Sequence, residues 1–154
     1  MLCPAMLFPV MLCISGCGPR DSASERSTPT APQSEPAEGA IPWIDDWHAA
    51  EQRQESEGKD LFVDFAADWC APCKQLDART FSEPEIATLL STQFIPVKLN
   101  VTEQGPDEMS LMKRFEVRTL PALLVIRDGN VLLRVSNFIS ADDLRPKLAD
   151  LPPR

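Results

Sequence analysis

Hydrophobic and polar residues divide the chain into three stretches of different character. Residues 1–16 carry no charge and are rich in Leu, Met, Val, Ile and Phe. The polar stretch that follows, up to residue 40, contains four prolines and no large apolar residue. From residue 41 onward, apolar runs alternate with polar turns, as in one folded domain with one core. The pattern predicts a leader over 1–16, a linker over 17–40 and a domain over 41–154.

The apolar periodicity of the domain changes several times between helix-like and strand-like. We expect helices at 43–57, 70–79, 82–90, 106–115 and from 140 onward, and strands at 61–66, 94–101, 121–127 and 131–135. Asp128-Gly129-Asn130 predicts a tight hairpin between the last two strands. This order predicts an α/β fold, with a central mixed sheet, a C-terminal antiparallel hairpin and flanking helices.

Capping and proline signals predict where several of these elements begin. Ser82 and Glu85 match a capping box with Pro84 in the first turn, and Ser140 matches a helix N-cap. Pro96 cannot donate a hydrogen bond within a sheet, so its strand is expected at an edge, or the proline at the start of the strand.

The leader is shorter than the roughly 20 residues that a membrane-spanning helix needs, and it leads into Ile-Ser-Gly-Cys at residues 14–17. These four residues resemble the bacterial lipobox, in which the cysteine is lipidated and becomes the new N-terminus. Cys17 is therefore the expected lipidation site, and Gly18 favours the outer over the inner membrane. An ordinary signal peptide and an uncleaved apolar anchor are the alternatives. We expect the linker to be a disordered tether that spans about 25–30 Å.

Composition and charge exclude one class of partner. The 154-residue chain is 44% hydrophobic and 25% charged, with a formal net charge of −8 at pH 7. Its acidic residues are scattered, and it has no basic stripe, so we expect no nucleic-acid partner. The acidity is accounted for by solubility alone.

The cysteines indicate chemistry rather than a structural crosslink. Three of the five cysteines lie in the leader or directly after it, so the domain holds only Cys70 and Cys73. A loop this short removes little chain entropy from the unfolded state. A zinc site needs about four N or S ligands, and the domain adds only His48. Attachment of a c-type haem needs a histidine where Lys74 stands. We therefore expect no metal and no bound cofactor.

Cys70-Ala71-Pro72-Cys73 falls where a predicted strand ends and a helix begins. Residues three apart in the first helical turn bring both sulfurs to one side. The unpaired N–H groups of that turn stabilise a thiolate, so we expect Cys70 to be an exposed nucleophile. Cys73, one turn further, is expected to be shielded and to resolve the mixed disulfide. Pro72 fixes its φ angle and limits flexing of the pair.

The residues around this pair resemble a known family. Residues 62–74, FVDFAADWCAPCK, are similar to the thioredoxin active-site signature. The Ala-Asp-Trp-Cys run, residues 80–84 and residues 99–102 resemble most the C-terminal periplasmic domain of the disulfide-interchange protein DsbD. The similarity covers about residues 43–151. It implies a thioredoxin fold and a thiol–disulfide oxidoreductase.

The resemblance also implies roles for residues outside the cysteine pair. Pro121 corresponds to the cis-proline of the family, and Leu120 would offer backbone hydrogen bonds to a bound substrate strand. Asp64 corresponds to the buried acid and Lys98 to the lysine beside it. A water-linked Asp64 would take the proton of the resolving cysteine. Solvated charges at a frayed strand edge are the alternative for both. Trp69 is expected to pack beside the sulfurs.

Together these features predict a membrane-anchored thiol–disulfide oxidoreductase of the periplasm or cell envelope. It would reduce protein disulfides or relay electrons to them. Its expected partners are disulfide-containing exported proteins and a membrane or exported thiol protein that donates electrons, and we expect a monomer. A disulfide oxidase or isomerase, and a non-catalytic binding module, are the alternatives. Residues 136–138, Ser-Asn-Phe, replace a glycine that often lines the substrate groove of the family, which suggests a different partner.

Overall fold

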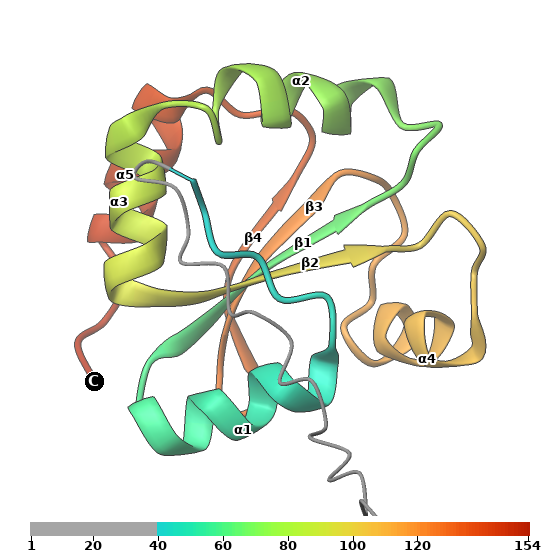
Figure 1. The fold of residues 1–154 in the computed structure, drawn as a ribbon, viewed down its shortest axis with the longest axis horizontal. Coiled ribbons are helices and arrows are strands. Elements are labelled where there is room, and N and C mark those ends of the chain that lie inside the picture. Colours follow the sequence, from blue (N-terminus) through green and yellow to red (C-terminus); the bar gives the residue numbers. More distant parts are fainter. Residues whose placement is uncertain (1–39) are drawn as a thin grey trace, which may run out of the picture. The chain divides into compact units, whose positions relative to one another are not determined.

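The computed structural model describes residues 40–154, and Figure 1 shows how their helices and strands are arranged. The elements follow one another as α1 Trp47–Glu57, β1 Asp60–Ala66, α2 Ala71–Arg79, α3 Pro84–Gln93, β2 Phe94–Asn100, α4 Pro106–Arg114, β3 Ala122–Arg127, β4 Asn130–Ser136 and α5 Ala141–Ala149. This order confirms the predicted α/β fold and the predicted succession of elements.

The four strands form one mixed sheet in the order β2-β1-β3-β4. Strand β1 pairs in parallel with β2 and antiparallel with β3, and β3 forms the predicted antiparallel hairpin with β4. Asp128 and Gly129 in the hairpin turn have φ values of 50° and 80°, the left-handed conformation that such turns require. Strand β2 is at an edge, as Pro96 predicts.

Helices cover both faces of this sheet. One core cluster joins alternate residues of β1, β2 and β3 to α1, to both cysteines and to side chains of α4. The other cluster lies on the opposite face and joins the remaining strand positions to residues of α2, α3 and α5. All seven residues of β1 are therefore buried. The carboxyl end of this central strand leads into the loop before α2 (Figure 1).

The first helix begins later than the sequence predicts. Helix α1 starts at Trp47, and the carboxylate of Asp46 caps it by accepting a 3.0 Å hydrogen bond from the N–H of Ala49. The residues before it run extended along the outer edge of β2, where Ile44 forms a parallel bridge with Val97. The apolar spacing at 43–47 therefore reflects packing of an extended segment, not a helical turn.

The predicted capping box at residue 82 is wrong. Helix α3 begins at Pro84 with Glu83 as its N-cap, and no side chain caps it. The hydroxyl of Ser82 instead donates a 2.9 Å hydrogen bond to the carbonyl of Ala78 at the end of α2. The cap predicted for the last helix is confirmed, because the hydroxyl of Ser140 accepts from the N–H of Asp143.

Candidate active site

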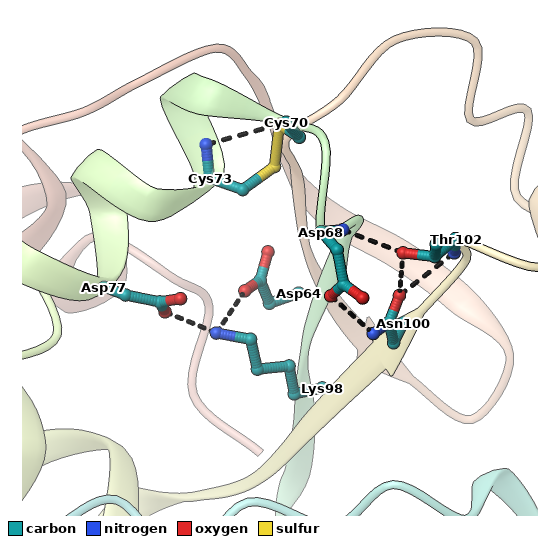
Figure 2. The surroundings of a disulfide bond; sticks show 8 residues. All are labelled: Asp64, Asp68, Cys70, Cys73, Asp77, Lys98, Asn100 and Thr102. Carbon is teal, nitrogen blue, oxygen red and sulfur yellow. Dashed lines mark hydrogen bonds and ion pairs between the residues drawn. A yellow bond between two sulfur atoms is a disulfide. The ribbon is translucent and has the colours of Figure 1, made fainter.

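The two cysteines of the domain lie at the start of α2 and are joined by a disulfide. Cys70 is the N-cap residue of the helix, and Pro72 lies in its first turn. The sulfur atoms are 2.07 Å apart, and the Cα atoms 5.3 Å. The Cys70 sulfur also accepts a 3.3 Å hydrogen bond from the N–H of Cys73, one of the N–H groups that the start of a helix leaves unpaired (Figure 2). The same N–H and the helix dipole would favour a thiolate on Cys70.

Both cysteines are buried in this disulfide form. Cys73 is 3% exposed, which agrees with its expected shielding, but Cys70 is only 4% exposed. The exposure expected for Cys70 is therefore wrong for the oxidised state. The reason is local, because its sulfur is drawn into the first turn of α2 by the disulfide bond and by the N–H of Cys73.

A carboxylate is buried in the sheet below the disulfide. Asp64 lies in the middle of β1 and is 1% exposed. In the view of Figure 2 its carboxylate lies between the Lys98 ammonium and the disulfide. One oxygen, Oδ2, is 3.6 Å from Nζ of Lys98, whereas Oδ1 is buried without a hydrogen-bond partner. The two residues are direct neighbours in the parallel pairing of β1 with β2, as the resemblance implies.

Burial shifts the acidity of this carboxylate toward neutral pH. The pKa of Asp64 is raised from its ordinary value of 3.8 to about 7. The main cause is the lost hydration of the charged form. The Lys98 ammonium opposes this effect in part, and the negative charge of Asp77 adds to it. Asp64 is therefore a group that can accept and release a proton near neutral pH.

Asp77 is a part of this site that sequence reasoning missed. Its carboxylate forms a hydrogen-bonded ion pair with Lys98, so Lys98 contacts one buried and one half-exposed carboxylate (Figure 2). Asp77 follows Cys73 by four residues on α2, and residues four apart on a helix share one face. That spacing was the signal that could have placed it near the cysteines.

A pocket of about 450 Å³ opens beside Cys73. Its wall includes Trp43, Cys73, Lys74, Asp77 and Lys98. The pocket brings solvent to the side chains that neighbour Asp64. It thereby provides a route by which a proton could leave the buried site.

Polar side chains tie the loop before Cys70 to the end of β2. The N–H of Asp68 donates to the hydroxyl of Thr102 at 2.8 Å, and the Asn100 amide donates to the Asp68 carboxylate at 2.9 Å. The side-chain Oδ1 of Asn100 in turn accepts from the N–H and the hydroxyl of Thr102, at 3.0 and 2.6 Å. We call Asp68, Asn100 and Thr102 the loop network (Figure 2). It fixes the backbone that carries Trp69 and Cys70, a role that the sequence motif alone does not reveal.

The remaining predicted site residues of the domain lie in loops. The Leu120–Pro121 peptide bond is cis, as the resemblance implies, and Leu120 packs against the core cluster that contains both cysteines. Trp69 is 64% exposed. Its predicted packing beside the sulfurs and the substrate-binding role of Leu120 stay predictions. Cys17 lies outside the described residues.

Two further features concern residues 40–154. No group of three or more His, Cys, Asp or Glu side chains in this part of the chain is placed to hold a metal ion. No helix there has the length and apolar character needed to cross a bilayer.

A thioredoxin-type sheet with a Cys-x-x-Cys disulfide at a helix start defines the class of thiol–disulfide oxidoreductase domains. The chain belongs to the thioredoxin-like domain family, which it matches over residues 47–152. A solved structure shares the fold. A thioredoxin from Thermus thermophilus superposes with a TM-score of 0.64 at 19% identity, covering 71% of this chain and 85% of that one.

Several similar relatives within the family are DsbD proteins. The thiol:disulfide interchange protein DsbD of Campylobacter jejuni strain RM1221 is 33% identical over 106 residues, 69% of this chain. That of Escherichia coli K12 is 32% identical over 103 residues, 64% of this chain. The oxidised C-terminal domain of Neisseria meningitidis DsbD has a TM-score of 0.61 and 25% identity, covering 71% of this chain and 99% of that domain. The chain spans 18% of the length of each of the two curated relatives.

Proposed function

We propose that this chain is a membrane-anchored thiol–disulfide oxidoreductase of the periplasm or cell envelope that reduces protein disulfides or relays electrons to them. One observation carries the proposal: the Cys70–Cys73 disulfide lies at the N-terminus of α2, and in the view of Figure 2 the buried carboxylate of Asp64 lies between this disulfide and Lys98. This arrangement supplies both a stabilised thiolate and a proton acceptor near neutral pH.

The reaction takes place in two exchanges that move two electrons. The Cys70 thiolate of the reduced pair attacks one sulfur of a substrate disulfide, which forms a mixed disulfide and releases the first substrate thiolate. The thiolate of Cys73 then attacks the Cys70 sulfur and releases the second substrate thiolate. The enzyme is then oxidised, with a Cys70–Cys73 disulfide, and the substrate has gained two electrons. A dithiol protein returns two electrons to the pair for the next cycle.

Asp64 serves the second exchange as a general base. Cys73 attacks only after its thiol has lost a proton, and it lies at the wall of the pocket next to Lys98 and Asp77. A carboxylate with a pKa of about 7 is ionised in a large fraction of molecules at neutral pH and can take that proton, directly or through a water molecule. Lys98 stabilises the ionised form until the proton arrives.

The proposed direction is reductive. The Cys-Ala-Pro-Cys sequence is closer to that of reducing thioredoxins than to that of strong oxidants. We expect a reduction potential nearer to thioredoxin's (about −270 mV) than to that of DsbA (about −120 mV). A redox titration with glutathione or dithiothreitol buffers measures it. A value near −120 mV, roughly that of DsbA, would mean that the protein acts as an oxidase and not as a reductase.

Insulin reduction by dithiothreitol tests the activity itself. We expect the chain to accelerate precipitation of the insulin B chain, Cys70→Ser to abolish the effect, and Cys73→Ala to accumulate mixed disulfides on Cys70. Cys17→Ser is the matched control, because it removes a cysteine outside the domain and should leave the rate unchanged. A folded wild-type protein with no rate above background would leave only a non-catalytic binding role.

The anchor is a separate part of the proposal. Lipidation at Cys17 would tether the domain to a membrane, with outer-membrane sorting favoured, so that it meets disulfides of exported proteins. Membrane fractionation of cells that express the full chain tests this, with Cys17→Ser as the comparison. We expect the wild type in the membrane fraction and Cys17→Ser in the soluble fraction. Membrane binding retained by Cys17→Ser would refute the lipid anchor.

A further inference from the structure

The Lys98 ammonium has an unusual set of neighbours. It contacts the carboxylates of Asp64 and Asp77, and it also lies over two aromatic rings. Its Nζ atom is 5.5 Å from the ring centroid of Trp43 and 5.8 Å from that of Phe81. Both distances are within the range of cation–π attraction, which is strongest for tryptophan. Two rings and two carboxylates thus hold a charge that a lysine at a strand edge would otherwise extend into water.

The backbone fixes Trp43 in this place. Its neighbour Ile44 donates a 3.0 Å hydrogen bond to the carbonyl of Pro96 and accepts a 2.8 Å bond from the N–H of Lys98 itself. The indole also packs edge-on against Phe81, with ring centroids 5.1 Å apart. The backbone of this segment is therefore hydrogen-bonded to Lys98, and the indole of Trp43 covers the side chain of the same lysine.

We propose that Trp43 is a positioning residue for thiol–disulfide exchange, whose ring holds the Lys98 ammonium in contact with Asp64. The inference rests on the proposed function and assigns Trp43 a role beyond packing. Trp43 and Lys98 both form part of the pocket wall beside Cys73, so the ring covers one side of an ammonium that borders the solvent of that pocket.

The consequence concerns the balance between the two carboxylates. Asp77 is about half exposed, whereas Asp64 is buried. Without the ring, the Lys98 ammonium becomes more hydrated and can move outward with Asp77. This movement weakens the attraction between Asp64 and Lys98, the only positively charged group that contacts Asp64 in the described part of the chain. Widening the present 3.6 Å separation to about 6 Å, at an effective dielectric constant of about 20, raises the pKa of Asp64 by about one unit.

The other groups around Asp64 do not replace this charge. Strand β3 places the uncharged Leu123 opposite Asp64, and α2 contributes Asp77 and Cys73. The remaining charged groups at the pocket are Asp45 and Asp68, which are negative, and Lys74, which is exposed on α2.

A titration of Asp64 tests the proposal without any turnover. The oxidised full-length chain is labelled with ¹³C at the aspartate carboxyl carbons, and the Asp64 signal is assigned by its absence in Asp64→Asn. We expect Trp43→Leu, which keeps an apolar side chain but no ring, to raise the pKa of Asp64 by about one unit. Trp43→Phe keeps a weaker ring and should restore part of the wild-type value.

Trp47→Leu is the matched control. Trp47 packs against Phe115 with ring centroids 5.3 Å apart, and its ring lies 5.9 Å from the guanidinium of Arg114, so it is a second tryptophan beside a cation at another place. Its replacement should leave the pKa of Asp64 unchanged. In a Lys98→Met background, Trp43→Leu should likewise have no further effect, because the residue through which it acts is gone.

The outcomes separate positioning from simple exclusion of water. A lower pKa of Asp64 in Trp43→Leu, seen also in the Lys98→Met background, would mean that the ring only keeps water out and would overturn the proposal. An unchanged pKa in Trp43→Leu would overturn it too. A raised pKa with parallel displacement of the pH profile of insulin reduction would support it. If the pKa of Asp64 rises in Trp43→Leu but neither the wild type nor any variant reduces insulin, the positioning of Lys98 by Trp43 stands and the proposed function fails.

Discussion

Replacing Asp64 by asparagine should make the oxidised protein more stable at alkaline pH. The substitution keeps the shape of the side chain and removes its charge. Asp64 is 1% exposed, and Oδ1 of its carboxylate has no hydrogen-bond partner, so its ionised form is poorly compensated in the folded protein. The single positive charge at 3.6 Å offsets the lost hydration only in part.

The magnitude follows from the raised pKa. Because about 7 in the folded protein lies above the ordinary value of 3.8, the folded protein keeps a proton on Asp64 that the unfolded chain has released. This stabilisation is fully present below the ordinary pKa and is lost as the pH rises through about 7. The difference is worth about 4 kcal/mol in all, and about 3 kcal/mol of it is lost between pH 5 and pH 8. Asparagine does not titrate and avoids this loss.

Guanidinium unfolding of the oxidised chain at pH 5 and pH 8 measures the effect. The difference in the free energy of unfolding between Asp64→Asn and the wild type should shift by about 3 kcal/mol in favour of the variant from pH 5 to pH 8. Equal slopes of the free energy against denaturant concentration would show that both proteins expose the same surface on unfolding, so that their free energies can be compared. Glu55→Gln is the control, because Glu55 is an exposed carboxylate on α1 and should show almost no such shift.

A difference between variant and wild type that is constant across this pH range would refute the reasoning. It would mean that Asp64 ionises in the folded protein as easily as in the unfolded chain. The general-base role proposed for Asp64 would then lose its support, because that role requires a pKa near neutral pH.

Three smaller predictions concern residues that support the fold or the loop before Cys70. Thr80→Val removes a buried hydroxyl that donates to the carbonyl of Ile139 at 2.6 Å, and it should lower the free energy of unfolding by about 1–3 kcal/mol in a denaturant titration. An equally stable variant would argue against this bond. Asn100→Ala breaks the loop network at its centre, including its contacts with Thr102, and should cost about 1 kcal/mol and slow insulin reduction; an unchanged rate would contradict its positioning role. Gly58→Ala should lower stability by about 1 kcal/mol in thermal unfolding, although the space around it is open, because φ is +65° there; a more stable variant would contradict the assigned backbone strain.

The local parts of the site were predictable because they depend on neighbours in the sequence. Cys70 and Cys73 are three residues apart at the junction of a strand and a helix, so helix geometry alone brings their sulfurs together. The succession of strands and helices followed from apolar periodicity, and the edge position of β2 followed from Pro96. The error at residues 43–46 arose because Ile44 pairs with Val97, which is distant in the sequence. The error at Ser82 arose because its hydroxyl bonds to Ala78 in the preceding helix instead of capping the next one.

By itself, the sequence determined the class of fold, the cysteine pair and, through resemblance, the buried acid with its lysine. Only the tertiary structure decided how charge is balanced around that acid. Asp77, Trp43 and Lys98 come from three separate segments, and their contacts depend on how the extended segment and α2 pack around β2. The physical reason is that burial and electrostatic interaction act through space. A residue's type and its spacing along the chain do not specify which charges will meet it.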